Sequence, residues 1–112
     1  MDIIESRARD SVVLAIAGRI DSSASAEFQR HLSAMVERGE NSLVLDFSSV
    51  DYISSAGLGV MLSTAKKLRS RSGSIVLAGV NARVRQVFDM SGFTQLFPIY
   101  DGVAAALSSG SS

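Results

Sequence analysis

Cysteine is absent from this chain of 112 residues, histidine occurs only once, and neither sign of charge is in excess. Without cysteine the chain has no disulfide, no catalytic thiolate and no cysteine-rich zinc site, and this composition suits a reducing cytoplasm. The single histidine, His31, cannot form a histidine metal cluster. The 11 basic and 11 acidic residues cancel, so we expect no direct contact with nucleic acid.

Long apolar runs are also missing. No stretch approaches the length that spans a bilayer, and the first residues lack the basic and apolar regions of a secretion signal. We therefore expect a cytoplasmic protein without membrane insertion. The content of 46% hydrophobic and 20% charged residues is typical of one folded domain. We expect that domain to span residues 1–107 and to be a monomer, with a flexible serine-rich tail at residues 108–112.

Hydrophobic periodicity predicts strands that alternate with helices along the chain. The predicted strands are residues 3–8, 11–17, 43–47, 75–80 and 96–100. Apolar stripes predict helices around residues 28–36, 58–68 and 84–88, and an alanine-rich helix is expected at residues 101–107. The alternation predicts a single α/β domain with a mostly parallel mixed sheet, an antiparallel N-terminal edge strand and helices packed on the sheet.

Serine and aspartate gather in the predicted turns at residues 18–23 and 48–59, which follow two of the strands. The carboxyl ends of parallel strands are where α/β domains usually meet ligands and partners. Ser54 and Ser55 begin the second helix, and serine there commonly caps orphan N–H groups. A hydroxyl beside the small Ala56 and Gly57 is equally suited to accept a phosphate, which would add about −1.5 to −2 charges. Both interpretations can hold together.

Other chemistry is not favoured by the motifs. The spacing of Gly57 and Gly59 lacks the third glycine of a dinucleotide fingerprint, and both are interpreted as letting the helix approach the sheet. Asp21 and Asp46 are interpreted as capping carboxylates rather than as a magnesium pair. No Gly-x-Ser-x-Gly elbow accompanies His31, so hydrolysis is not expected. We predict no catalytic residue, no cofactor and no metal site.

Several of these segments together resemble a STAS domain, specifically that of an anti-sigma factor antagonist. They are residues 18–21 (GRID), 43–47 (LVLDF), 52–59 (YISSAGLG) and 83–92 (RVRQVFDMSG), followed by Phe93 and Leu96-Phe97. The resemblance covers nearly the whole chain apart from the tail.

The resemblance implies a non-catalytic regulator of transcription that works by partner switching. In such a switch the unphosphorylated antagonist binds an anti-sigma factor that is also a serine kinase, and the sigma factor is released. Phosphorylation on serine ends the complex, and a PP2C-type phosphatase restores the binding form. By position the acceptor is Ser55. Well-studied antagonists have aspartate and serine or threonine where this chain has Ser54 and Ala56, which makes Ser54 a competing acceptor.

Two further functions stay open at this point. An apolar face at Leu58, Met61 and Leu62 would also suit a STAS subunit of a membrane transporter or lipid-trafficking complex. The strand-end crevice would suit a sensor of a small ligand such as a nucleotide. The residues predicted to form the partner-binding surface are Asp21, Ser22, Asp46, Ser54, Ser55, Ala56, Gly57, Leu58 and Met61.

Overall fold

The computed structural model describes residues 1–110, and the α/β class predicted from the sequence is confirmed. The strands are β1 (Asp2–Ala8), β2 (Ser11–Ile20), β3 (Ser42–Ile53), β4 (Ser74–Ala78) and β5 (Ile99–Tyr100). The helices are α1 (Ser25–Glu37), α2 (Ser55–Arg69), α3 (Ala82–Met90) and α4 (Val103–Gly110), and a short 3-10 helix covers Phe93–Gln95.

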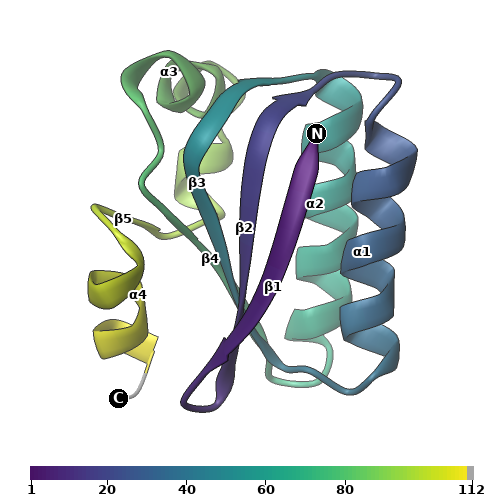
Figure 1. The fold of residues 1–112 in the computed structure, drawn as a ribbon, viewed down its shortest axis with the longest axis vertical. Helices are drawn as coiled ribbons and strands as arrows, with labels where there is room; N and C mark the ends of the chain where they lie inside the picture. The colour runs from purple at the N-terminus through teal and green to yellow at the C-terminus, as the bar shows by residue number, and fades with distance from the viewer. Residues whose placement is uncertain (111–112) are drawn as a thin grey trace.

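The five strands form one sheet in the order β1-β2-β3-β4-β5 (Figure 1). β1 pairs with β2 in antiparallel direction, and every other neighbouring pair is parallel. The predicted mixed sheet with an antiparallel N-terminal edge is therefore confirmed. Because α1, α2 and α3 each follow a parallel strand, their first turns gather at the edge where β2, β3 and β4 end.

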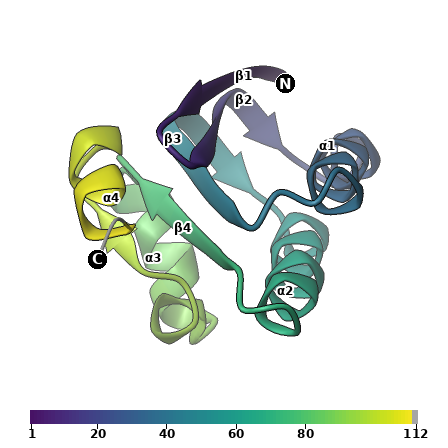
Figure 2. The same ribbon diagram turned by 90° about the horizontal axis from the view of Figure 1, so that it is seen from below.

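The main core lies on one face of the sheet. Alternate residues of the strands point into it, among them Val12, Leu14 and Ile16 of β2. Helices α1 and α2 lie side by side over this face, and Figure 2 shows them on the side of the sheet away from α4. Phe88 of α3 joins the same core and meets the Phe47 ring edge to face, with 6.3 Å between the ring centroids.

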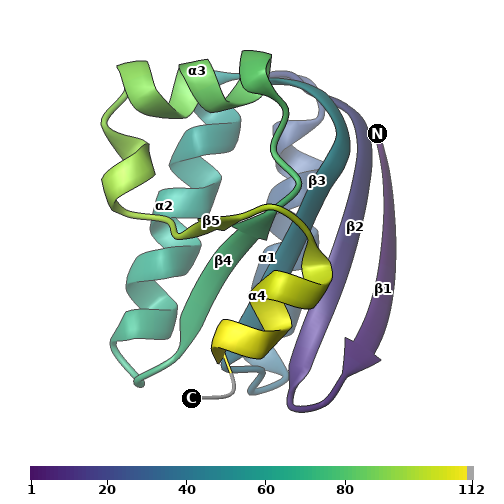
Figure 3. The same cartoon turned by 90° about the vertical axis from the view of Figure 1, so that its left-hand side faces the viewer.

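The opposite face is only partly covered. Helix α4 packs there on a small cluster made by Val13, Val44, Ala78 and Ala106. In Figure 3 this helix lies over the lower part of the sheet at β3 and β4, while the upper parts of β1, β2 and β3 have no helix before them. The sheet therefore keeps an open region on this side.

Two strands are longer than the sequence pattern predicted. β3 was expected to end at residue 47 but continues to Ile53, and β2 continues past residue 17 to Ile20. The extra pairs include Gly18 with Val50 and Ile20 with Ile53, and two register shifts interrupt them. The polar residues 48, 49 and 51 are exposed, which is why this half of β3 resembles a loop in the sequence.

The end of α4 also differs from the prediction. The helix runs to Gly110, three residues past the predicted domain boundary at Leu107. Residues 111 and 112 of the predicted tail lie outside the described residues. None of the helices within residues 1–110 has the length and apolar character of a membrane span.

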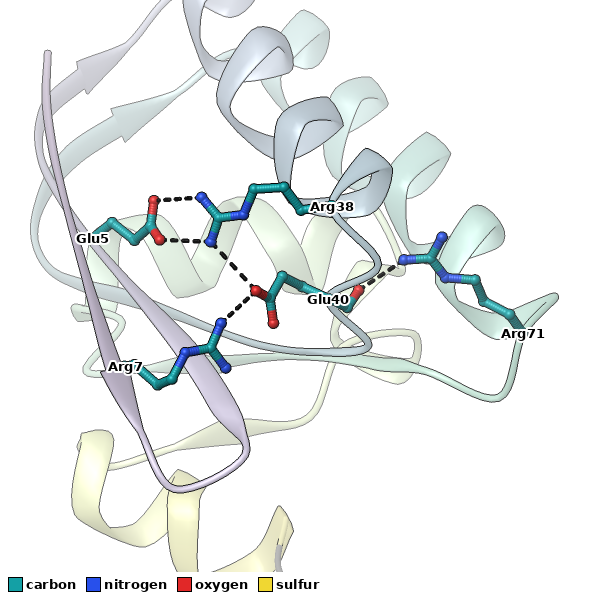
Figure 4. A network of polar contacts seen from close by, with 5 residues as sticks. All are labelled: Glu5, Arg7, Arg38, Glu40 and Arg71. Atoms are coloured by element: carbon teal, nitrogen blue, oxygen red, sulfur yellow. Dashed lines mark hydrogen bonds and ion pairs between the residues drawn. The ribbon is translucent and has the colours of Figure 1, made fainter.

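A network of ion pairs and hydrogen bonds lies at the other end of the sheet, away from the carboxyl ends of the parallel strands (Figure 4). Arg38, which follows α1, bonds Glu5 of β1 at 2.7 Å and Glu40 at 3.3 Å. Arg7 of β1 also contacts Glu40, and Arg71 donates to the Glu40 carbonyl at 2.8 Å. The network ties the edge strand to the loops that follow α1 and α2.

Candidate functional site

Ser54 joins the end of β2 to the start of α2. Its amide donates to the carbonyl of Ile20 at 2.8 Å, and its Oγ accepts from the Gly57 amide at 3.1 Å. The residue has an extended backbone and is the N-cap of α2. Only 9% of its surface is exposed. The capping interpretation of this serine is confirmed.

Ser55 occupies the first position of α2, directly after that cap. Unlike Ser54, it is exposed to solvent, and so is the neighbouring Ala56. The two adjacent serines therefore have different environments. One hydroxyl is buried within a helix cap, and the other stands at the surface beside the partial positive charge of the helix N-terminus.

The two glycines of α2 also differ. A Cβ at Gly57 would lie 2.9 Å from side-chain atoms of Ile20 and Ile53, so only glycine lets the helix sit this close to the strand ends. A Cβ at Gly59 would meet nothing within 4 Å, and the residue is exposed. The predicted close approach to the sheet is therefore correct for Gly57 and wrong for Gly59.

The loop between β2 and α1 lies beside the α2 start because Ile20 holds Ser54. The Asp21 carboxylate accepts from the Ser23 hydroxyl at 2.8 Å and from the Ala24 amide at 2.9 Å. The Ser23 bond, then the amide bond and the nearby charge of Arg19 hold the pKa of Asp21 below its usual range. Asp21 thus organises this loop, and Ser22 remains exposed on it.

Asp46 lies elsewhere. Its carboxylate accepts from the Ser48 amide at 3.0 Å, and because Ser48 is itself a residue of β3, Asp46 caps no helix and bonds no loop amide among the described residues, contrary to the interpretation from the sequence. The neighbouring Leu45 and Phe47 point into the main core, so Asp46 projects from the opposite face of the sheet. Within residues 1–110, Asp21 and Asp46 belong to no group of three or more potential metal ligands.

The apolar residues expected on the partner-binding surface are in the core. Met61 has no exposed surface and Leu58 only 6%, and Gly57 is also buried. The predicted set therefore does not form one surface. Its exposed members near the α2 start are Ser22, Ser55 and Ala56, with half-buried Asp21 beside them.

A pair that the sequence analysis did not identify stands at the same strand ends. The guanidinium of Arg19 lies over the ring of Tyr52, 4.4 Å from its centroid. The two residues are direct partners in the β2–β3 register. Detecting them required knowing that β3 continues through Tyr52, which the exposed polar residues before it conceal.

The connection between β4 and α3 is also held by hydrogen bonds of one side chain, that of Asn81. Asn81 caps α3 by accepting from the Val84 amide at 2.9 Å, and its amide nitrogen donates to the Val50 carbonyl at 2.8 Å. Gly79, two residues earlier, has φ +70, and a Cβ at this position would lie 3.0 Å from the Cβ of Ser48 in β3. The edge that carries Ser55 is thus built from well-connected turns.

A mixed sheet of this order, with a serine-capped helix at its carboxyl edge, defines a small α/β domain. The STAS domain family profile matches residues 4–106, and the chain belongs to that family. The resemblance predicted from the sequence is confirmed.

Known proteins agree with this assignment. BtrV of Bordetella bronchiseptica, assigned as an anti-sigma factor antagonist, is 40% identical over 95 residues, which cover 85% of this chain and 82% of BtrV. A Thermotoga maritima protein assigned to the same class has a similar structure, with a TM-score of 0.91, 23% identity, and coverage of 96% and 92% of the two chains. Phosphorylated SpoIIAA of Bacillus shares the fold with a TM-score of 0.75, 20% identity, and coverage of 96% and 97%.

Proposed function

We propose that this chain is an anti-sigma factor antagonist whose switch residue is Ser55. In its unphosphorylated form it binds a kinase-type anti-sigma factor and frees the sigma factor. Phosphorylation of Ser55 ends that complex, and a PP2C-type phosphatase restores it. The observation that carries the proposal is the difference in environment between the two serines: Ser54 is buried as the N-cap of α2, while the Ser55 side chain is exposed to solvent.

A phosphate on Ser55 is compatible with the folded domain. It would add about −1.5 to −2 charges beside the N-terminus of α2, where the helix dipole favours negative charge. It would leave the Ser54 cap and the core beneath it untouched. Domain stability is therefore expected to survive phosphorylation.

The same phosphate would weaken the binding of a partner protein that covers the turn before α2. Several exposed residues around Ser55 are small, namely Ala56 and Gly59 on the helix and Ser22 on the adjoining loop. A partner packed closely on such a surface would have to desolvate a dianion, which is costly without a compensating cation. The chain itself is the substrate of the kinase and the phosphatase, not a catalyst.

The related protein names favour this function over the alternatives. BtrV, at 40% identity, is assigned as an anti-sigma factor antagonist, and SpoIIAA has been solved in a phosphorylated form. The transporter-subunit hypothesis was motivated partly by an apolar face at Leu58, Met61 and Leu62. Leu58 and Met61 are buried in the core and Leu62 is half-buried, so this face offers little apolar surface to a partner.

The test is site-mapped phosphorylation with ATP and the cognate kinase-type anti-sigma factor, followed by binding measurements. We expect phosphate on Ser55 alone. Ser55→Ala should bind the anti-sigma factor as the parent does, and Ser55→Asp should bind at least about 10-fold more weakly. Ser54→Ala serves as the matched control, since it removes the neighbouring hydroxyl and should still be phosphorylated. Phosphate on Ser54, or equal binding by both Ser55 variants, would refute the proposal.

A further inference from the structure

The open region of the sheet, on the face that α4 only partly covers, contains a hollow of about 170 Å³. Its lining residues lie on β1, β2 and β3, beyond the cluster on which α4 packs. One row of register partners crosses it from Ile4 to Ala15 and then to Asp46. The hollow exists because the middle residue of this row is small, while its neighbours on either side are larger.

The hollow combines an apolar floor with acidic walls. Ala15 and Ala17 form the floor, and the Ile4 side chain beside them is 68% exposed, which is unusual for isoleucine. The ionisable residues that line the hollow are Asp2 and Asp46, both carboxylates. Asp46 is half-buried in the middle of the sheet, on the face opposite the main core.

We propose that this hollow, lined by Asp2, Ile4, Ala15, Ala17 and Asp46, is a docking site for a protein partner. The occupant is a large aliphatic side chain flanked by lysine or arginine. The aliphatic group would remove Ile4 and the alanine floor from water, and the flanking cations would pair with the two carboxylates. Arg19, further along β2, does not line the hollow, because its guanidinium lies over the Tyr52 ring.

This second surface is separate from the proposed switch. Helix α2, which begins at Ser55, packs on the other face of the sheet, so the two surfaces are back to back. Binding in the hollow is therefore independent of the charge on Ser55. The domain would be able to hold one partner constantly while exchanging another.

The test uses two synthetic peptides with blocked ends, KRLLKR and its charge-reversed counterpart EELLEE. Fluorescence polarisation measures their affinities, and amide chemical shifts locate the contact. We expect KRLLKR to bind more tightly than EELLEE and to shift the amides of Ile4, Ala15 and Asp46. Asp46→Asn should weaken KRLLKR binding about fivefold, the scale of one lost ion pair. Ser55→Asp should bind KRLLKR as the parent does, whatever the outcome of the switch experiment.

The matched control is Asp10→Asn, which removes the same charge from the exposed β1–β2 turn. It should leave KRLLKR binding unchanged, whereas an equal loss would mean unspecific attraction and overturn the proposal. Equal affinity for EELLEE, or shifts confined to other surfaces, would do so too. Ile4→Ser provides a second variant on the edge strand in case Asp46→Asn unfolds. Self-association that Ile4→Ser abolishes would assign the hollow to a second copy of the chain and also overturn it.

Discussion

Replacing each glycine of α2 by alanine gives a paired test of how the helix meets the sheet. In a helix interior, alanine is more favourable than glycine by about 0.5–1 kcal/mol, because glycine loses more backbone freedom on folding. Gly59 lies one turn into α2, and an added methyl would meet nothing within 4 Å. Gly59→Ala should therefore stabilise the protein by about 0.5–1 kcal/mol.

Gly57→Ala should have the opposite effect. Its methyl would lie 2.9 Å from Ile20 Cγ2 and from Ile53 Cγ1, well inside the usual carbon contact distance. Both isoleucines are fully buried or nearly so, at 0% and 2% exposure, and cannot move aside freely. Overpacking of this kind costs about 1–3 kcal/mol, and the gain in helix propensity in the first turn offsets only part of it. We expect a net loss of about 0.5–2 kcal/mol.

Urea unfolding followed by far-ultraviolet circular dichroism would measure both variants, since the chain has no tryptophan. The two midpoints should move in opposite directions while the slope of the unfolding free energy with urea stays the same. Stabilisation of both variants would show that α2 can retreat from the strand ends, and the reasoning on close approach would then be wrong. Gly59→Ala should, in addition, weaken anti-sigma factor binding if the partner packs closely on this helix.

Three other perturbations follow from the local geometry. Ser54→Ala should destabilise the domain by about 1 kcal/mol in urea unfolding, because the Gly57 amide loses its acceptor, while Ser54→Asp should keep the cap and most of the stability. Asn81→Ala loses both the α3 cap and the bond to β3, and its thermal midpoint should fall by an amount equivalent to about 1–2 kcal/mol. The pKa of the Glu40 carboxyl is lowered chiefly by its hydrogen bond from Arg7. The ionised Glu40 therefore stabilises the folded protein fully above the unfolded pKa of about 4.3, and this contribution is lost as the pH falls through the lower folded pKa. Glu40→Gln should therefore unfold at lower urea than the parent at pH 7, and the difference should shrink as the pH is lowered below about 4.3. A difference that stays constant as the pH falls would contradict this origin.

Much of the fold follows from short apolar runs. The LVLDF segment and the stripes of the helices predict the alternation of elements correctly, because those residues alternate or repeat with the period of the structure they form. The upper half of β3 could not be predicted in this way. Its Val50 and Ile53 are buried, but exposed polar residues and a register shift separate them, so no simple period remains.

The candidate site was predictable only in part. A helix start at Ser54 and Ser55 follows from local sequence, but which serine is the cap depends on one hydrogen bond to Gly57. The different roles of Gly57 and Gly59 depend on where Ile20 and Ile53 lie in space. Arg19 and Tyr52 are 33 residues apart and meet only through strand register. Such contacts are tertiary and leave no pattern in a single sequence.

The ion-pair network at the far end has a consequence for behaviour in solution. β1 is the outer strand of the sheet, and an unpaired strand edge can recruit other chains into unwanted assemblies. Glu5 and Arg7 pair with Leu14 and Val12 and lie on the face of the sheet that α1 and α2 cover. Apolar residues at these two positions would favour association of the edge strand with other chains. Arg38 and Glu40 hold these charges in place. Acid conditions, which neutralise both glutamates, would therefore leave Arg7 and Arg38 without their partners and loosen the attachment of the edge strand to the loop after α1.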